Sequence, residues 1–224
     1  MAIVDAATEV FAERGFAAAQ MVDVARAARV SVGTLYNYVE GKGALLLLCA
    51  ERPFGDIAEG RTLPVATPDR AELLARLGKT LARHVRVAAL DRALDEPARP
   101  GNRDAQLRDV IGGLFDLLAA TRVAADAMER SAQEAPDLAE LFYRRVRVQI
   151  LDQLTEYLTR VAGVRPLAPP LTPELAARSA LEVVTWWARH RHRDPAPPRL
   201  DDAHAREVAI ALVVNSLAAK PVEP

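Results

Sequence analysis

Apolar residues recur at helical spacing from the start of the chain, with acidic residues between them. The defining apolar positions are Ile3, Val4, Ala7, Val10 and Phe11. Residues three and four apart lie on one face of a helix, so this pattern predicts an amphipathic helix at the N-terminus. Gly15 is expected to end it, because glycine readily adopts the left-handed conformation that closes many helices.

Two shorter helices are predicted next, joined by a tight turn. Residues 21–28 form the first helix and residues 29–31 the turn, and Ser31 is a suitable N-cap for a third helix that reaches about Tyr38. A fourth, apolar helix begins at Lys42. This order is typical of a helix-turn-helix, whose second short helix enters the major groove of DNA.

Longer helical segments, separated by prolines, make up the rest of the chain. They are residues 69–90, 103–120, 122–133, 137–162, 173–192 and 201–219. The apolar stripe of the fourth segment consists of Leu138, Leu141, Phe142, Val146, Ile150, Leu154, Tyr157 and Val161. No strand pattern competes with these helices, so the predicted fold class is all-α: a three-helix helix-turn-helix head followed by a larger C-terminal helical bundle.

The third short helix carries the residues that fit DNA recognition. Gly33 costs about 1 kcal/mol relative to alanine inside a helix, and close approach to DNA is one reason to keep it. Thr34, Tyr36 and Asn37 supply neutral hydroxyl and amide groups for phosphates or base edges. The ammonium of Lys42 and the free N–H groups of its helix could both face phosphate.

The residues from Ile3 to Leu48 resemble the DNA-binding domain of the TetR family of regulators. The matching positions are Ala6, Ala7, residues 11–16, Val24, Ala25, Ala28, Val30, Ser31, residues 33–36, Tyr38, Lys42, Ala44 and Leu45. The resemblance implies an Ω-shaped all-helical homodimer. It assigns residues 1–48 to DNA binding and residues 49–224 to ligand binding and dimerisation.

Carried over by position, the resemblance defines a DNA-facing set. Its members are Val32, Gly33, Thr34, Tyr36, Asn37, Tyr38 and Lys42, with Gln20 as a partial substitute for a hydroxyl contact. Outside this motif, Tyr36 and Tyr38 would be interpreted as half-buried aromatic residues, and Asn37 as a solvated polar residue. In register with the motif, DNA contact is the favoured interpretation of Tyr36, while base contact by Asn37 is an even choice.

Several positions depart from the family pattern. Ala19 and Gln20 replace a hydroxyl pair, and Val32 and Val39 replace a common lysine and phenylalanine. Residues 40–41 are Glu-Gly instead of Pro-Ser. Arg29 replaces the usual turn glycine, so either a non-glycine residue adopts a positive φ or the turn differs.

The charge balance bears on how tightly such a head could bind DNA. The whole chain has 29 basic and 30 acidic residues, hence a formal net charge of −1. Residues 1–52 alone contain five basic and six acidic side chains. Non-specific affinity for DNA is therefore expected to be modest and its salt dependence shallow.

Other classes of protein find little support in the sequence. Cys49 is the only cysteine and lies in an apolar run, which favours a buried, unreactive thiol. Catalytic and cofactor-binding motifs are absent, so neither an enzyme nor a cofactor is expected. Residues 190–193, His-Arg-His-Arg, are interpreted as a basic helix end rather than a metal site. Without an apolar run of about 18 residues or a signal-peptide pattern, a cytoplasmic protein without a membrane partner is expected.

The C-terminal helices are expected to hold an effector site and a dimer interface. The site is placed between segments 69–90, 103–133 and 137–162, and mostly apolar helices favour an apolar or aromatic effector. Its predicted lining residues are Phe115, Met128, Phe142 and Gln149, and the predicted dimer residues are Trp186, Trp187, Val208 and Leu212. One tryptophan is expected in the core and the other at an interface or cavity, because adjacent residues face differently on a helix. Ordinary packing within one chain is the alternative for these last two helices.

The sequence supports two functions for the protein. The first is a dimeric repressor that is released from a palindromic double-stranded operator by a small-molecule effector. The alternative is a helical ligand-binding or interaction protein with a weakened DNA-binding head, which the acidic head and Val32 favour.

Overall fold

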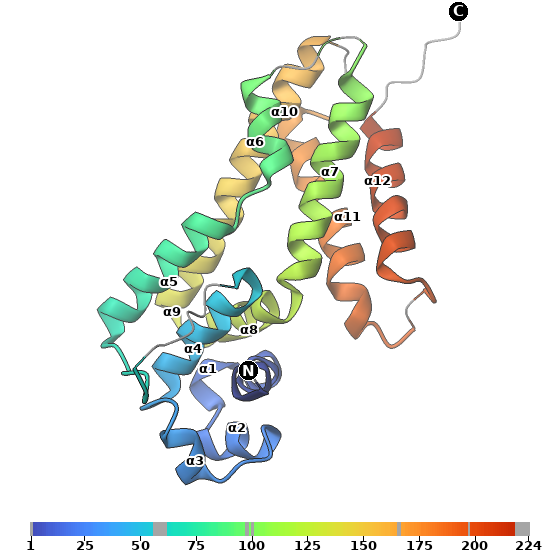
Figure 1. The fold of residues 1–224 in the computed structure, drawn as a ribbon. Coiled ribbons are helices and arrows are strands. Elements are labelled where there is room, and N and C mark those ends of the chain that lie inside the picture. The colour runs from blue at the N-terminus through green and yellow to red at the C-terminus, as the bar shows by residue number, and fades with distance from the viewer. Residues whose placement is uncertain are drawn as a thin grey trace, which may run out of the picture. The chain divides into compact units, whose positions relative to one another are not determined.

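The computed structural model describes residues 2–55, 62–96, 99, 101–164, 167–196 and 198–217. Its helices are α1 (Ala2–Ala18), α2 (Met21–Ala27), α3 (Val32–Tyr36), α4 (Lys42–Glu51), the 3-10 turn η1 (Arg52–Phe54), α5 (Arg70–His84), α6 (Ala88–Asp95), α7 (Arg103–Ala120), α8 (Arg122–Ala132), α9 (Pro136–Ala139), the π-helix η2 (Glu140–Arg147), α10 (Val148–Val164), α11 (Pro173–Ala188), the 3-10 turn η3 (His190–Arg193) and α12 (Asp202–Leu217) (Figure 1). Within these ranges no β-strand forms, which confirms the all-α prediction.

The chain forms two compact units, each built from two stretches of sequence. Unit 1 comprises Met1–Val85 and Thr121–Arg147, and unit 2 comprises Arg86–Ala120 and Val148–Pro224. The predicted border after residue 48 is not a border between these units, because α4 runs across it from Lys42 to Glu51. The helix-turn-helix therefore shares a unit with α5, α8 and α9.

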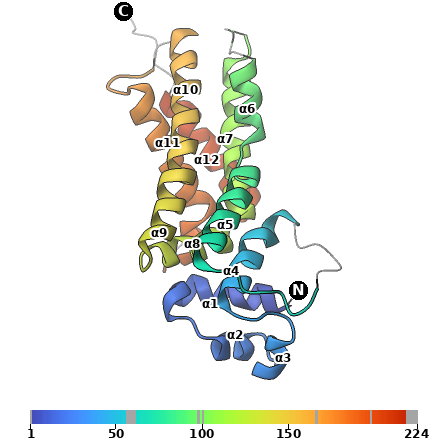
Figure 2. The same ribbon diagram turned by 90° about the vertical axis from the view of Figure 1, so that its left-hand side faces the viewer.

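Unit 1 is organised around α1, which packs against α8, α4 and α2. Phe11, Leu35, Leu45 and Leu77 are fully buried in a single core that these helices share. In Figure 2, α2 and α3 follow α1 at the blue end of the chain. The short helices of the head therefore rest on a broad apolar base, which an isolated pair of such helices could not supply.

The first helix bends where the sequence predicts its end. Gly15 has φ 78° and ψ 165°, and one more turn continues to Ala18. A Cβ at this position would lie 2.6 Å from Oε2 of Glu134, the end of an exposed side chain that can move aside. Glycine is thus required here by the backbone conformation.

Unit 2 is organised around α7, which packs against α6, α11 and α12, while α10 packs against α6 and α11. Its core consists of aliphatic residues with Phe115 and Tyr157, and both aromatic rings are at most 2% exposed. Both views show α7 and α10 within one bundle, with the start of α7 and the end of α10 at the same end of it (Figures 1 and 2).

Two predicted long helices are each interrupted. Segment 69–90 divides into α5 and α6, because Val85 and Val87 leave the helical conformation and Val87 buries its side chain. Segment 137–162 becomes α9, η2 and α10, although its apolar stripe still faces inward. Spacing alone misses such breaks, since tertiary packing overrides helical periodicity.

The remaining helices follow their predicted ranges closely. Segment 173–192 ends as an α-helix at Ala188 and continues as η3, while 201–219 is helical over Asp202–Leu217, its last two residues lying outside the described part of the chain. Among the described residues, no helix is long and apolar enough to span a membrane.

Candidate nucleic-acid interface

The third helix of the head begins at a side-chain cap, as predicted. Ser31 Oγ accepts a hydrogen bond from the backbone N–H of Thr34 at 2.9 Å and lies 2.8 Å from the Thr34 hydroxyl. Leu35 is fully buried beneath the helix. A five-residue helix is too short to persist alone, so the cap and this buried anchor fix its position.

The turn before α3 adopts the unusual conformation that the sequence raised as one option. Arg29 has φ 57°, the one positive φ of a non-glycine residue in the part of the chain that the structure describes. Its side chain is exposed at the surface of the head. The turn therefore keeps the shape that a glycine would give, and adds a cationic group beside α3.

The outward face of α3 presents apolar, aromatic and neutral polar groups. Val32, Tyr36 and Tyr38 are 38%, 45% and 46% exposed, and Gly33 and Asn37 are exposed as well. Thr34 is half-buried because its hydroxyl pairs with the cap. These six residues of the predicted DNA-facing set are thus brought together on and just after one short helix.

Gly33 has no packing role in the chain. A Cβ at this position would meet only Ser31 Oγ, at 3.7 Å, which is an ordinary van der Waals contact. The backbone does not demand glycine there either, since Gly33 has no positive φ. Gly33 therefore weakens α3, and neither the packing nor the backbone conformation at this position accounts for a glycine there.

Lys42 is half-buried and its ammonium is bonded to the end of α1, while a phosphate contact at Lys42 stays a prediction. Its Nζ donates to the carbonyls of Phe16 at 2.8 Å and Ala17 at 3.0 Å, and lies 5.0 Å from the centre of the Phe16 ring. Burial lowers the pKa of this amine. The reason is structural: the last carbonyls of α1 need donors, and Lys42 at the start of α4 supplies them.

The start of α2 is held by a carboxylate where the family has a hydroxyl. Gln20 is the N-cap residue with an exposed side chain, and its backbone N–H donates to Asp23 Oδ2 at 3.1 Å. Asp23 also lies 3.1 Å from Arg14 and 3.4 Å from Arg26. Both arginines remain largely exposed at the surface beside α2 while they pair with Asp23.

Sequence reasoning passed over Arg29 and Val22 as surface residues of the head. The side chain of Arg29 is exposed, and Val22, in the first turn of α2, is 42% exposed. The position of Arg29 in the turn between α2 and α3 was a usable signal, because side chains at such a turn lie beside the recognition helix.

A returning loop braces the end of the head. Val65 N donates to the Tyr38 carbonyl at 2.8 Å, Glu40 N donates to the Val65 carbonyl at 3.0 Å, and Thr67 N donates to Glu40 Oε2 at 3.1 Å. The Glu-Gly pair that departs from the family pattern therefore has a local role, because Gly41 makes room for Thr67, whose Oγ1 would lie 2.9 Å from a Cβ there.

The four predicted effector-lining residues are divided between the units. Phe115 is buried on α7 in unit 2, and Gln149 is exposed on α10 of the same unit. Met128 and Phe142 are buried in unit 1. Unit 2 also has an open cavity of about 540 Å³, lined by Arg86, Ala88, Ala89, Arg92, Asp109, Gly113, Asp116, Leu117 and Arg206. This lining is of mixed charge and contains none of the predicted residues.

Neither tryptophan of α11 is in the core, contrary to the prediction for one of them. Trp186 and Trp187 are both half-buried, with ring centres 4.9 Å apart and planes at 83°. Edge-to-face contact lets adjacent residues share one surface region despite their different directions on the helix. Val208 on α12 is half-buried, and Leu212 is 49% exposed.

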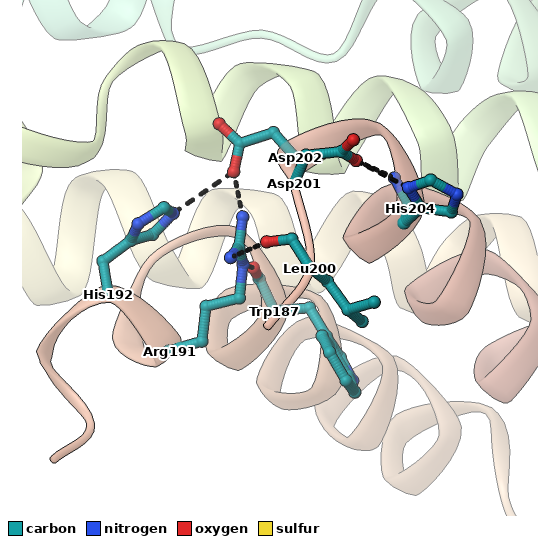
Figure 3. A network of polar contacts seen from close by, with 7 residues as sticks. All are labelled: Trp187, Arg191, His192, Leu200, Asp201, Asp202 and His204. Atoms are coloured by element: carbon teal, nitrogen blue, oxygen red, sulfur yellow. Dashed lines mark hydrogen bonds and ion pairs between the residues drawn. The ribbon is translucent and has the colours of Figure 1, made fainter. Parts of the chain in front are cut away.

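The His-Arg-His-Arg segment fastens α11 to α12 (Figure 3). Arg191 is buried and donates to the carbonyls of Trp187 at 2.7 Å and Leu200 at 2.9 Å, and it also pairs with Asp202. His192 lies 3.3 Å from Asp202, and His204 lies 2.9 Å from Asp201. Within the described ranges, no group of three or more metal-ligating side chains is found.

A capped short helix, turned outward over a three-helix core, is the geometry of a helix-turn-helix motif. Residues 3–49 match the family described as bacterial regulatory proteins, tetR family. These residues, α1 to α4 of the head, are therefore similar to the DNA-binding domain of that family. No curated protein matches the chain.

Solved structures share the fold over almost the entire chain. The fatty acid degradation regulator FadR from Bacillus halodurans is 21% identical, with a TM-score of 0.53 and coverage of 98% of this chain and 96% of that one. A TetR-like regulator from Rhodococcus sp. RHA1 is 20% identical, with a TM-score of 0.56 and coverage of 98% and 95%. AibR in complex with isovaleryl coenzyme A and operator DNA is 19% identical, with a TM-score of 0.55 and coverage of 94% and 95%.

Proposed function

We propose that this protein is a transcriptional repressor that binds a palindromic operator as a homodimer and is released by a small-molecule effector. The observation that carries the proposal is the outward face of α3. It has a glycine that the fold does not need, with Tyr36 and Asn37 exposed beside it. A DNA backbone or base edge close to Gly33 gives the missing reason for that residue.

Phosphate contacts are assigned to arginines of the head in place of Lys42. Arg29, Arg14 and Arg26 are exposed beside α2 and α3, whereas the ammonium of Lys42 is used within the fold. Val32 offers a methyl surface to thymine, a contact that needs no charge. This distribution suits a head whose specificity depends on base edges more than on net charge.

The effector is placed among the helices that follow the head. AibR was solved with isovaleryl coenzyme A and operator DNA, which supports a ligand-responsive regulator here. Phe115, Met128, Phe142 and Gln149 stay predicted lining residues. Because the head and α8 belong to one compact unit, an effector that moves α8 would move the head with it.

We place the dimer interface on α11 and α12. Arg191 joins the two helices by an ion pair with Asp202 and a hydrogen bond to the Leu200 carbonyl. Partly exposed apolar groups there support the choice, namely Trp186, Trp187, Val208 and Leu212. Two such helices from each subunit would form a four-helix bundle with twofold symmetry, which matches a palindromic operator.

Tyr36→Ala tests the DNA-binding role. Because Tyr36 is exposed, its loss should leave the fold intact and weaken binding to DNA selected by the wild type by about 1–3 kcal/mol. Gel-shift titration measures the affinity, and circular dichroism checks the fold. Tyr36→Phe keeps the ring and removes only the hydroxyl, so it separates the contribution of the hydroxyl to affinity from that of the ring. Unchanged affinity of Tyr36→Ala would count against the assignment.

A ligand-binding protein with a weakened DNA head is the second candidate. The hydrogen bonds that hold the Lys42 ammonium within the head and the excess of acidic residues in positions 1–52 favour it. Selection from a random DNA pool separates the two functions: a repressor enriches one palindromic sequence, and the alternative enriches none.

A further inference from the structure

Arg103, the first residue of α7, is buried with part of its guanidinium unpaired. The residue is 3% exposed, and its Nη1 donates to Asp104 at 2.8 Å. Its Nε and Nη2 are buried and have no hydrogen-bond partner among the described residues. Burial of a charged donor without a partner opposes folding, so this edge of the guanidinium calls for an explanation.

The same edge of two other arginines holds a carboxylate. Arg70 uses Nε and Nη2 to grip both oxygens of Asp137, at 2.6 and 2.5 Å. Arg206 uses the same two nitrogens for Asp116, at 2.8 and 3.1 Å. These two N–H groups point in parallel and match the spacing of carboxylate oxygens. Arg103 offers this fork inside unit 2 without a carboxylate in it.

Two more buried polar atoms accompany Arg103. Gln106 follows it one turn later on α7, and its Nε2 is fixed on the Glu96 carbonyl at 2.7 Å, while Oε1 is buried without a partner in the described ranges. The Tyr157 hydroxyl on α10 is likewise buried and unpartnered. Burial raises the pKa of Tyr157, and the nearby charge of Arg103 opposes that rise. Because its pKa is raised, Tyr157 stays protonated, and its hydroxyl can donate a hydrogen bond near the charge of Arg103.

Buried apolar residues follow the cluster along each of the two helices. On α7 the next inward positions are Leu107 and Val110, and on α10 they are Leu154, Leu158 and Val161, all at most 1% exposed. An organic acid combines the two chemistries, since its carboxylate fits a guanidinium fork and its carbon chain fits apolar neighbours. Gln106 Oε1 is an acceptor, so it repels a second anionic group and suits a ligand O–H.

We propose that Arg103, Gln106 and Tyr157 form a buried site for a small monocarboxylic acid, held by its carboxylate on Nε and Nη2 of Arg103. Tyr157 donates to the same carboxylate, and Gln106 accepts from a hydroxyl close to it. The identification of this acid as the effector rests on the proposed function. The binding site itself does not, because it can be measured without DNA.

Calorimetric and thermal-shift titration of the full chain with butyrate, 3-hydroxybutyrate and hexanoate tests the site. Two sets of comparison probes are used: the uncharged alcohols butanol and hexanol, and the inorganic anions chloride and phosphate. We expect the carboxylates to bind and raise the melting temperature, with 3-hydroxybutyrate tighter than butyrate, and the alcohols to have no effect. Failure of all three carboxylates, or equal stabilisation by chloride or phosphate, would overturn the proposal.

Two variants locate the site. Arg103→Met should weaken carboxylate binding by about tenfold to a hundredfold, because charge-assisted hydrogen bonds are lost. Its melting temperature without ligand should not fall, since an incompletely paired buried charge is removed. Tyr157→Phe should weaken binding by a smaller factor. Arg108→Met, an exposed position of the same helix, is the matched control and should bind as the wild type does.

DNA binding and binding of the carboxylic acid are measured separately. Gel shifts of each variant without acid report on the DNA-binding role alone, and the same gels with hexanoate report on release. Carboxylate binding that Arg103→Met leaves unchanged overturns this site even if DNA binding stands. Loss of binding in that variant supports the site even if no operator is found.

Discussion

The outward face of α3 and the buried Arg103 at the start of α7 both have polar groups without a hydrogen-bond partner in the described part of the chain. The groups on α3 are exposed to water, and those of Arg103 are not. On α3, Tyr36 and Asn37 lie in water, so their exposure costs nothing and only their spacing beside Gly33 gives them meaning. At α7, two nitrogens of Arg103 are buried without partners in the described structure, which is itself energetically unfavourable. A surface site is therefore recognised by pattern, and a buried one by the pairing of its atoms.

The largest effect is expected where the exposed face depends on a buried anchor. Leu35 is fully buried below α3, so Leu35→Ala should lower the free energy of unfolding by about 2–5 kcal/mol and abolish DNA binding through loss of the platform. Urea denaturation followed by circular dichroism measures it. Leu63→Ala, at a leucine that is 53% exposed, should change stability by less than about 0.5 kcal/mol. Similar losses in both variants would show that α3 is not anchored by this side chain.

A buried ionisable group in unit 1 should respond to pH in a way that the exposed face does not. Burial raises the pKa of Cys49 to about 12, from an ordinary value of 9.0. Its contribution is fully present below the unfolded pKa and is lost as pH rises toward the folded one, by up to about 1.4 kcal/mol per pH unit. Urea denaturation across this range, compared with Cys49→Ala, isolates the effect. Identical pH profiles of the two proteins would mean that the thiol is solvated.

The cap of α3 should have a smaller effect on stability. Ser31→Ala removes the acceptor of the Thr34 N–H, so the unfolding free energy should fall by about 1 kcal/mol and operator affinity should fall with it. Ser179→Ala, an exposed serine on α11, is the control for serine removal. A Ser31→Ala protein as stable as this control would place the start of α3 elsewhere.

The head was largely predictable because its signals are local. The Ser31 cap and the bend at Gly15 each follow from a few neighbouring residues, and the positive φ at Arg29 is one of the two options that the resemblance left open. The hydrogen bonds of Lys42 could not be predicted, because its partners are carbonyls about 25 residues earlier in the chain. The break after α5 and the unpaired edge of Arg103 also depend on packing between distant segments, which helical spacing does not encode.

Gly33→Ala separates DNA binding from stability, because the fold and DNA make opposite demands on this residue. The space at Gly33 admits a methyl group, so the free energy of unfolding should rise by at most about 1 kcal/mol in Gly33→Ala. The control Gly163→Ala, near the end of α10, should raise it by a smaller amount. Affinity for wild-type-selected DNA should fall in Gly33→Ala alone. A Gly33→Ala protein that is more stable and binds this DNA as tightly as the wild type would contradict the assignment of α3 to the duplex.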